Sequence, residues 1–305
     1  MNKFFTFSTK VSAPTTAKNI VKELVYIGQT GALYITGEST AVSNWLAMER
    51  NRKTDYCSRG YPVVLLHGLA HNQSWAAKVS RSLKETGFSV RAVNYATIGP
   101  SLDSAADAAA EHIIQTAYEA GVDKVHVAAH SLGGLVLRIA ASRNIELDQM
   151  LVSGITVGSP HSGTPLANSL LTYLPVVGEL AVNLQPGSEV LRKLSLTWGN
   201  PNTKWVSIYS KEDELVPGLS GKMFNHNIDI TNIELQGLGH AGLIYNGLGV
   251  TTIVNSLIDA DDLAIERSVE RWVKEYSHKQ SKTTPVIKSA RPKKLSNTGL
   301  TAHAY

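Results

Sequence analysis

The chain has 305 residues, of which 43% are hydrophobic and 18% are charged, so we expect a packed core rather than disorder. The formal net charge is +4, but residues 279–305 contain six Lys or Arg and no Asp or Glu, which leaves residues 1–278 at −2. The excess of basic residues therefore lies in the C-terminal tail, and the composition of residues 1–278 does not indicate a nucleic-acid-binding domain.

Cysteine content and hydropathy narrow the class of protein further. Cys57 is the only cysteine, which excludes an intrachain disulfide and a disulfide-stapled scaffold. The apolar run at the N-terminus is broken by Thr6, Ser8 and Lys10, and it is too short for a signal peptide. No stretch approaches the ~18 consecutive apolar residues that a membrane span needs. We therefore expect a cytoplasmic protein, although the sequence leaves secretion by another route open.

Residues 1–60 are expected to form an N-terminal extension that is partly helical. Apolar residues at helical spacing between Ile20 and Val25 predict one short helix, and residues 44–52 predict another around Trp45. From Tyr61 the pattern becomes regular, and residues 61–278 are expected to form the main domain.

Short apolar runs alternate with helical patterns through residues 61–278. Strands are predicted at 61–66, 88–94, 125–129, 150–157, 204–209 and 230–235. Helices are predicted between Asn72 and Gly87, from the capping pattern Ser104-x-x-Asp107 to Gly121, over 132–141, and from Asp262 to about His278. This alternation predicts βαβ units and an α/β fold, with a mostly parallel sheet covered by helices on both faces.

The last predicted helix is amphipathic. The apolar residues expected to face inward are Leu263, Val269, Trp272, Val273 and Tyr276. Residues 279–305, which are rich in Lys, Ser, Thr and Pro without periodicity, are expected to form a disordered basic tail. Weak contact between this tail and an anionic surface is one interpretation, and a solvated tail is the simpler one.

The segment Ala129-His130-Ser131-Leu132-Gly133-Gly134 lies between a predicted strand and a predicted buried helix. A serine in such a turn occupies strained backbone and needs small neighbours, which Ala129 and Gly133 supply. The start of the helix also offers N–H groups and a partial positive charge to a developing oxyanion. Ser131 is therefore the candidate nucleophile; the alternative is a buried serine in a tight turn.

A second turn, His67-Gly68-Leu69, follows the strand predicted at 61–66. It is expected at the carboxyl edge of the sheet, where open α/β sheets bind ligands. Gly68 lets the backbone approach a ligand closely, and the N–H groups of Leu69 and Leu132 are the candidate oxyanion-hole donors. His67 is interpreted as a residue that anchors the loop rather than one with a chemical role.

These motifs, together with Gly158-Ser159-Pro160-His161-Ser162-Gly163-Thr164-Pro165, resemble those of bacterial lipases and esterases of the α/β-hydrolase superfamily. The likeness is greatest to the class whose serine lies in an Ala-His-Ser-x-Gly-Gly motif, and it covers roughly residues 61–278. Ala129 stands where the strict G-x-S-x-G pattern has its first glycine. The resemblance implies an α/β-hydrolase fold and a catalytic triad in the chain order serine, acid, histidine.

The resemblance also implies which residues act as acid and base. The family pattern Asp-x-x-Val-Pro matches Asp213, whereas spacing alone leaves Glu212 and Glu214 open. Of the ten histidines, His240 alone lies beyond Asp213, after the last predicted strand and before the last predicted helix. The alternative for His240 is a surface histidine in a glycine-rich loop.

The remaining histidines are given no catalytic role. His130 and His161 are interpreted as pocket-lining or structural residues. No group of His, Cys and Asp has metal-ligand spacing, so neither a metal nor another cofactor is expected.

Between Gly163 and Trp198 the chain is longer than an ordinary connection. Its apolar residues at near-helical spacing are Leu166, Leu170, Leu171, Leu174, Val177, Leu180 and Leu184. A helical cap over the site, at about residues 163–198, is expected. Two interpretations stay open: the leucines line an apolar acyl pocket, or they pack onto the main domain.

The expected function is that of a serine carboxylic-ester hydrolase acting on apolar, medium-chain ester or lipid substrates through an acyl-enzyme. An acyltransferase or thioesterase would use the same residues on lipid or carrier-bound acyl groups. Outside the enzymes, the alternative is a non-catalytic protein that binds an apolar ligand. No nucleic-acid partner is expected, and the sequence does not set the oligomeric state.

Overall fold

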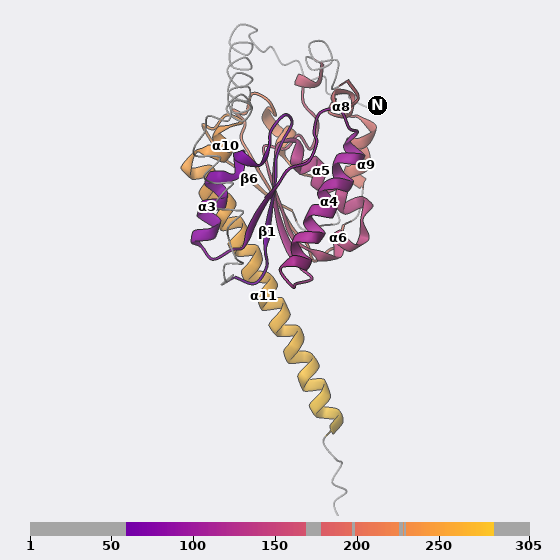
Figure 1. Cartoon of the computed structure of the whole chain (residues 1–305), viewed down its shortest axis with the longest axis vertical. Coiled ribbons are helices and arrows are strands. Elements are labelled where there is room, and N and C mark those ends of the chain that lie inside the picture. The colour runs from indigo at the N-terminus through magenta and orange to yellow at the C-terminus, as the bar shows by residue number, and fades with distance from the viewer. Residues whose placement is uncertain (1–58, 169–177, 197–198, 226–227, 229, 284–305) are drawn as a thin grey trace, which may run out of the picture. The chain divides into compact units, whose positions relative to one another are not determined.

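A computed structural model describes residues 59–168, 178–196, 199–225, 228 and 230–283 (Figure 1). The two helices predicted within residues 1–58, the apolar residues at 169–177 and the tail from residue 284 lie outside the described residues.

Six parallel strands form one sheet in the order β2-β1-β3-β4-β5-β6. The strands are β1 (Val63–Leu66), β2 (Val90–Val93), β3 (Val125–His130), β4 (Leu151–Val157), β5 (Lys204–Tyr209) and β6 (Ile230–Glu234). Each overlaps a predicted strand. The central strands β1, β3 and β4 are almost wholly buried, and a strand covered on both faces is a near-continuous apolar run. The predicted parallel sheet is confirmed.

Helices cover both faces of this sheet (Figure 1). One face carries α4 (Leu102–Glu119), α5 (Leu132–Arg143) and α6 (Ile145–Met150). The other carries η1 (Gln73–Ala76), α3 (Ala77–Glu85), α10 (Gly242–Tyr245) and the first part of α11 (Gly247–Thr283). Side chains of β1 alternate between the layers: Val64 and Leu66 join the α4–α5 cluster, and Val63 and Leu65 join the other.

Besides the last helix, α11, which begins at Gly247 rather than at the predicted Asp262, two helix starts differ from those predicted. Helix α4 begins at Leu102, earlier than expected, because the side chain of Ser101 accepts a hydrogen bond from the N–H of Ser104. Asn72 caps a helical turn as predicted, but this turn is the short 3-10 helix η1, and α3 follows it as a separate element. In both places local polar side chains determine where the helix begins.

The predicted cap region contains α8 (Gly178–Asn183) and α9 (Glu189–Leu196). Its buried leucines are Leu180, Leu184, Leu191 and Leu194, and all belong to the α4–α5 core cluster. Among the described residues, the structure therefore supports the interpretation in which these leucines pack onto the main domain. After β5, a further 3-10 turn, η3 (Gly218–Gly221), leads toward β6.

Contacts divide the chain into the units Met1–Ala264 and Ile265–Tyr305, with the boundary inside α11. Within the first unit, Ile253 and Leu257 of α11 are fully buried in the core. Within the second, Val269, Trp272 and Val273 are exposed, so the prediction that they face inward is wrong. An amphipathic pattern identifies an apolar stripe on a helix, but it does not say what covers the stripe. None of the helices that the structure describes combines the length and the hydropathy of a membrane crossing.

A buried polar contact joins the first part of α11 to the sheet. His126 Nδ1 lies 2.8 Å from Ser153 Oγ, and His126 Nε2 lies 3.2 Å from Asp261 Oδ1. This serine, histidine and aspartate are buried near the amino ends of β3 and β4. Ligands bind at the carboxyl ends of parallel strands, so we interpret this contact as structural.

Candidate active site

Ser131 occupies a strained turn between the carboxyl end of β3 and the first residue of α5. Its φ is +54°, a left-handed conformation that is unusual for a residue other than glycine. The N–H of Ser131 donates to the carbonyl oxygen of Val157 at 2.8 Å, which fixes the turn against the end of β4. The predicted setting for a nucleophile is thus present in the backbone.

Close backbone packing around Ser131 explains the glycines of both motifs. A Cβ atom at Gly68 would lie 2.8 Å from Ser131 Cβ and 3.3 Å from Ser131 Oγ. A Cβ atom at Gly133 would lie 2.6 Å from the carbonyl oxygen of His67. These distances bring the turns at 67–69 and 130–133 together, as the sequence predicted.

Asp213 and His240 form a buried contact. His240 Nδ1 lies 2.8 Å from Asp213 Oδ2, and both side chains are buried. Asp213 Oδ1 accepts hydrogen bonds from the N–H groups of Leu215 and Val216 at 2.9 and 2.8 Å. A carboxylate held in this way orients the imidazole with Nδ1–H donating, and Nε2 is then the ring nitrogen that carries the lone pair a base needs.

The two carboxylates that spacing left open are placed differently. Glu212 is exposed, and its side chain accepts a hydrogen bond from Ser210 Oγ at 2.8 Å. One carboxylate oxygen of Glu214, Oε2, is buried. It lies beside Gly239, and a Cβ atom added at Gly239 would be 2.9 Å from it. The carboxylate that meets His240 within hydrogen-bonding distance is that of Asp213.

Gly158 links the Ser131 turn to the Asp213–His240 pair. It follows Val157, the residue that accepts the hydrogen bond from Ser131, and its own N–H donates to the carbonyl of Ile208. Its φ is +57°, and a Cβ atom there would lie 3.2 Å from both Asp213 Oδ2 and His240 Cε1. Gly158 belongs to the motif at residues 158–165, whose sequence predicts no role for it.

The N–H groups predicted as oxyanion-hole donors have no acceptor among the described residues. Leu132 is the first residue of α5, where no carbonyl one turn earlier is available to its N–H. Leu69 follows Gly68, which lies against Ser131. Both donors are therefore available to an oxygen bound beside the serine.

His67 anchors the loop, as the sequence interpretation favoured. Its ring stacks on that of Tyr95 with centroids 4.4 Å apart, and its Nε2 accepts from the Tyr95 N–H at 3.3 Å. Its Nδ1–H can then donate to the carbonyl of Gly68 at 2.9 Å. Burial lowers the pKa of His67 below 6.5, so the neutral ring that this pattern requires is favoured.

The His130 ring packs against that of His240, and the rings of His71 and Trp75 lie against His130 in turn. The His130 ring centroid is 4.7 Å from that of His240 and 5.6 Å from that of Trp75. Burial, together with the neighbouring His240 and His67, lowers the pKa of His71 to about 4. Among the described residues, no group of three or more His, Cys, Asp or Glu side chains could hold a metal ion, so these rings do not form a metal centre.

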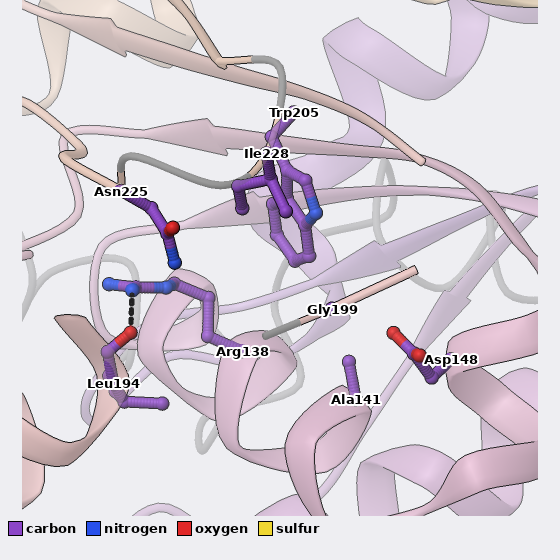
Figure 2. Close-up of a pocket in the computed structure, with 8 residues that line it drawn as sticks. All are labelled: Arg138, Ala141, Asp148, Leu194, Gly199, Trp205, Asn225 and Ile228. Atoms are coloured by element: carbon purple, nitrogen blue, oxygen red, sulfur yellow. Dashed lines mark hydrogen bonds between the residues drawn. The ribbon is translucent and has the colours of Figure 1, made fainter. Parts of the chain in front are cut away.

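His161 connects the loop after β4 to Arg138 on α5. Arg138 Nη1 donates to His161 Nδ1 at 3.2 Å, so His161 Nε2–H points to Thr156 Oγ1 at 2.9 Å. The other end of the guanidinium donates to the carbonyl of Leu194 at 2.6 Å (Figure 2). Burial lowers the pKa of Arg138 to about 10, and burial lowers that of His161 as well. His161 is thus structural, one of the two roles that the sequence suggested.

Arg138 also lines a cavity of about 30 Å³ that is separate from the candidate site. The residues around it are Arg138, Ala141, Asp148, Leu194, Gly199, Trp205, Asn225 and Ile228 (Figure 2). None of the predicted catalytic residues is among them. A cavity of this size has room for one or two water molecules rather than for an ester substrate.

Comparisons with known proteins agree with this fold. Residues 63–222, more than half of the chain, match the model of the alpha/beta hydrolase family. The chain belongs to the alpha/beta hydrolase family, which confirms the resemblance seen in its motifs.

Individual relatives cover only part of the chain. It is 30% identical over 123 residues to a triacylglycerol lipase of Pseudarthrobacter phenanthrenivorans, which is 37% of each protein. A triacylglycerol lipase of Burkholderia plantarii is also 30% identical over 123 residues, 37% of this chain and 33% of that protein. The chain thus matches about a third of the length of these relatives.

Among solved structures, the mature lipase BlEst2 of Bacillus licheniformis is similar with a TM-score of 0.57. The sequence identity is 15%, and the match covers 68% of this chain and 95% of the lipase. At this identity the similarity shows the fold alone.

Proposed function

We propose that this chain is a serine carboxylic-ester hydrolase in which Ser131 is the nucleophile, His240 the base and Asp213 the acid. The observation that carries the proposal is the buried 2.8 Å contact between His240 and Asp213, connected through Gly158 and Val157 to the strained turn of Ser131. Two relatives of this chain are triacylglycerol lipases, which supports ester hydrolysis as the reaction.

In the proposed mechanism, His240 Nε2 takes the proton of Ser131 Oγ while the oxygen attacks the ester carbonyl. The backbone N–H groups of Leu69 and Leu132 stabilise the resulting oxyanion, and His240 protonates the leaving alcohol. Water activated by the same histidine then hydrolyses the acyl-enzyme. Asp213 holds the His240 tautomer and stabilises the imidazolium that forms in both steps.

The proposed substrates are apolar esters of medium chain length. The support for chain length comes from the apolar residues between Leu166 and Val177, most of which lie outside the described residues. Leu180, Leu184, Leu191 and Leu194 pack into the core and do not line an acyl pocket.

The test is hydrolysis of p-nitrophenyl esters from acetate to palmitate by the wild type, Ser131→Ala and Ser159→Ala. Ser131→Ala should lower kcat by about 10⁴-fold or more. Ser159 is a matched control, because its buried hydroxyl has no hydrogen-bond partner among the described residues, and Ser159→Ala should stay within a few-fold of the wild type. Equal activity of Ser131→Ala and the wild type would show that Ser131 is not the nucleophile.

Addition of an alcohol acceptor to the same assay separates hydrolysis from acyl transfer. A hydrolase should release mainly the free acid, whereas an acyltransferase would form a new ester. Tight binding of an ester without turnover would instead indicate a non-catalytic binding protein.

A further inference from the structure

Strained backbone lies beside both proposed oxyanion-hole donors. Among the described residues, two that are not glycine have a positive φ: Ser131 at +54° and Ala70 at +56°. Ser131 directly precedes Leu132, and Ala70 directly follows Leu69. Such strain persists only where the surrounding structure holds it, and it gathers at functional sites. The contacts that hold Ala70 therefore bear on the geometry of the candidate site.

Ala70 is the third residue of a four-residue turn, which the N–H of His71 closes by donating to the carbonyl of Gly68 at 3.3 Å. A positive φ at this position is typical of a type II turn, where glycine or asparagine is usual. The side chain of Ala70 is exposed, so its packing does not account for the conformation. The Ala70 N–H, however, donates to Thr97 Oγ1 at 3.1 Å. This hydrogen bond fixes the direction of the peptide that precedes Ala70.

Thr97 belongs to the segment that follows β2, and this segment holds the turn at two further points. Buried and exposed residues alternate along it, as in an extended chain, and Tyr95 and Thr97 are among the buried ones. The Tyr95 hydroxyl donates to the carbonyl of His67, and Asn94 Oδ1 accepts from the N–H of Gln73 at 2.6 Å. The turn is thus attached to this segment before, within and after its four residues.

We propose that Thr97 is a positioning residue for the oxyanion hole. By accepting from Ala70, it holds the turn in the conformation that presents the Leu69 N–H to an oxygen bound at Ser131. Gly68, the first residue of the same turn, lies so close that a Cβ atom there would be 2.8 Å from Ser131 Cβ. Oxyanion-hole donors act at about 2.7–3.1 Å from the oxyanion, so a small shift of the turn weakens this contact. The inference rests on the proposed function and adds to it a residue that acts through the backbone.

A purely structural role for Thr97 predicts a different result. Loss of its hydroxyl would then lower the free energy of unfolding without favouring one state of the reaction. A positioning role predicts that kcat and kcat/KM fall together while KM changes little, because the Leu69 N–H binds most strongly when charge develops on the oxygen. The strain at Ala70 permits a second, independent test, since glycine adopts a positive φ freely and a β-branched residue does not.

The first test is hydrolysis of a soluble p-nitrophenyl ester by Thr97→Val, which is nearly isosteric and lacks the acceptor. Thr97→Val should lower kcat by about tenfold or more and leave KM within about threefold of the wild type. Thr97→Ser keeps the hydroxyl and should stay within about threefold of the wild type in both constants. The inhibition constant of an alkylboronic acid, which forms a tetrahedral adduct with a nucleophilic serine, should rise in Thr97→Val by a factor similar to the loss in kcat.

Thr116→Val is the matched control. Thr116 is 7% exposed and Thr97 is 8% exposed, and the Thr116 hydroxyl donates to the carbonyl of His112 within α4. The same substitution there removes a buried hydroxyl without touching the turn. Its kcat should equal that of the wild type, whatever its effect on thermal unfolding.

Substitutions at the exposed Ala70 test the inference even if Thr97→Val does not fold. Ala70→Val should lower kcat by about tenfold, because a β-branched side chain at a positive φ drives the turn out of its conformation. Ala70→Gly should stay within about threefold of the wild type, because glycine keeps the turn without strain. Added to Thr97→Val, Ala70→Gly should raise kcat by about threefold or more for the same reason.

Wild-type kcat in a folded Thr97→Val, or in Ala70→Val, would overturn the inference, and so would a Thr97→Ser variant as slow as Thr97→Val. In those cases, loss of activity in Ser131→Ala would leave the proposed function standing. A wild type that hydrolysed no ester would overturn the proposed function and this inference with it.

Discussion

The ring of His130 lies against the ring of His240, with centroids 4.7 Å apart and planes tilted by 44°. The backbone of His240 also lies near the His130 ring, but neither ring nitrogen of His130 has a partner in hydrogen-bond geometry among the described residues. Burial, with His240 and His71 nearby, holds the pKa of His130 well below 6.5. His130 therefore packs as a buried ring against the candidate base, and burial favours its neutral form.

We predict that the shape of His130 matters more than its nitrogen atoms. His130→Ala should lower kcat/KM for a p-nitrophenyl ester by more than about tenfold and destabilise the fold by about 2–4 kcal/mol, because it leaves a cavity beside His240. His130→Phe should keep kcat/KM within about tenfold of the wild type. Its larger ring should mainly lower the free energy of unfolding. Steady-state kinetics and urea unfolding check both. If His130→Phe lost as much activity as His130→Ala, a ring nitrogen would be needed after all.

A second prediction distinguishes the three neighbouring carboxylates. Asp213→Asn should lower kcat by about 10⁴-fold, because an amide cannot hold His240 Nδ1–H and stabilise the imidazolium. Glu212→Gln and Glu214→Gln should stay within about tenfold of the wild type, because neither side chain contacts His240 within ion-pair distance. The measurement is kcat for the three isosteric variants under the same conditions, so that each variant serves as a control for the other two. A larger loss in Glu214→Gln than in Asp213→Asn would move the acid to Glu214.

A third prediction concerns the close approach of Gly68 to Ser131. Gly68→Ala should lower kcat by about 10²-fold, because its Cβ would lie 2.8 Å from Ser131 Cβ and displace the nucleophile. Gly247→Ala is the matched control, since no atom lies within 4 Å of a Cβ added there. Both are measured with a soluble ester and by thermal unfolding. Wild-type activity in Gly68→Ala would mean that the two turns are further apart than the structure places them.

The parts of the fold that sequence could predict are those that depend on local apolar patterns. Buried strands such as β3 and β5 are short apolar runs, and the small residues around Ser131 indicate a tight turn. By contrast, the choice between Asp213 and Glu214 depends on which side chain faces the loop that carries His240. Spacing along the sequence does not determine that direction. The resemblance to the family pattern selected Asp213; in the structure its carboxylate accepts from two backbone N–H groups and lies within hydrogen-bonding distance of His240.

The misjudged elements depend on partners distant in sequence. Val269 and Trp272 lie on a helix, as predicted, but an amphipathic pattern alone does not determine whether such residues are buried. The structural role of Arg138, a polar residue within an apolar helix, could not be predicted from its neighbours in sequence. Its two hydrogen-bond acceptors come from the loop after β4 and from α9. Such long-range contacts become visible only when the elements are packed.

The last prediction is that the fold loses stability as the pH falls below about 6.5. Burial is the first cause that lowers the pKa of His67, His71, His130 and His161. Each of these rings binds a proton less readily in the folded chain than in the unfolded chain, so lowering the pH favours unfolding. The effect is absent well above pH 6.5, and for His71 it grows until about pH 4, where the folded form also titrates. Each histidine can contribute a slope of up to about 1.4 kcal/mol per pH unit.

Urea unfolding between pH 7.5 and 4.5 measures this slope. His71→Asn should make it shallower, and His112→Asn, at an exposed position on α4, should leave it unchanged. Stability that stayed constant or rose over this range would contradict the neutral, buried state of these rings.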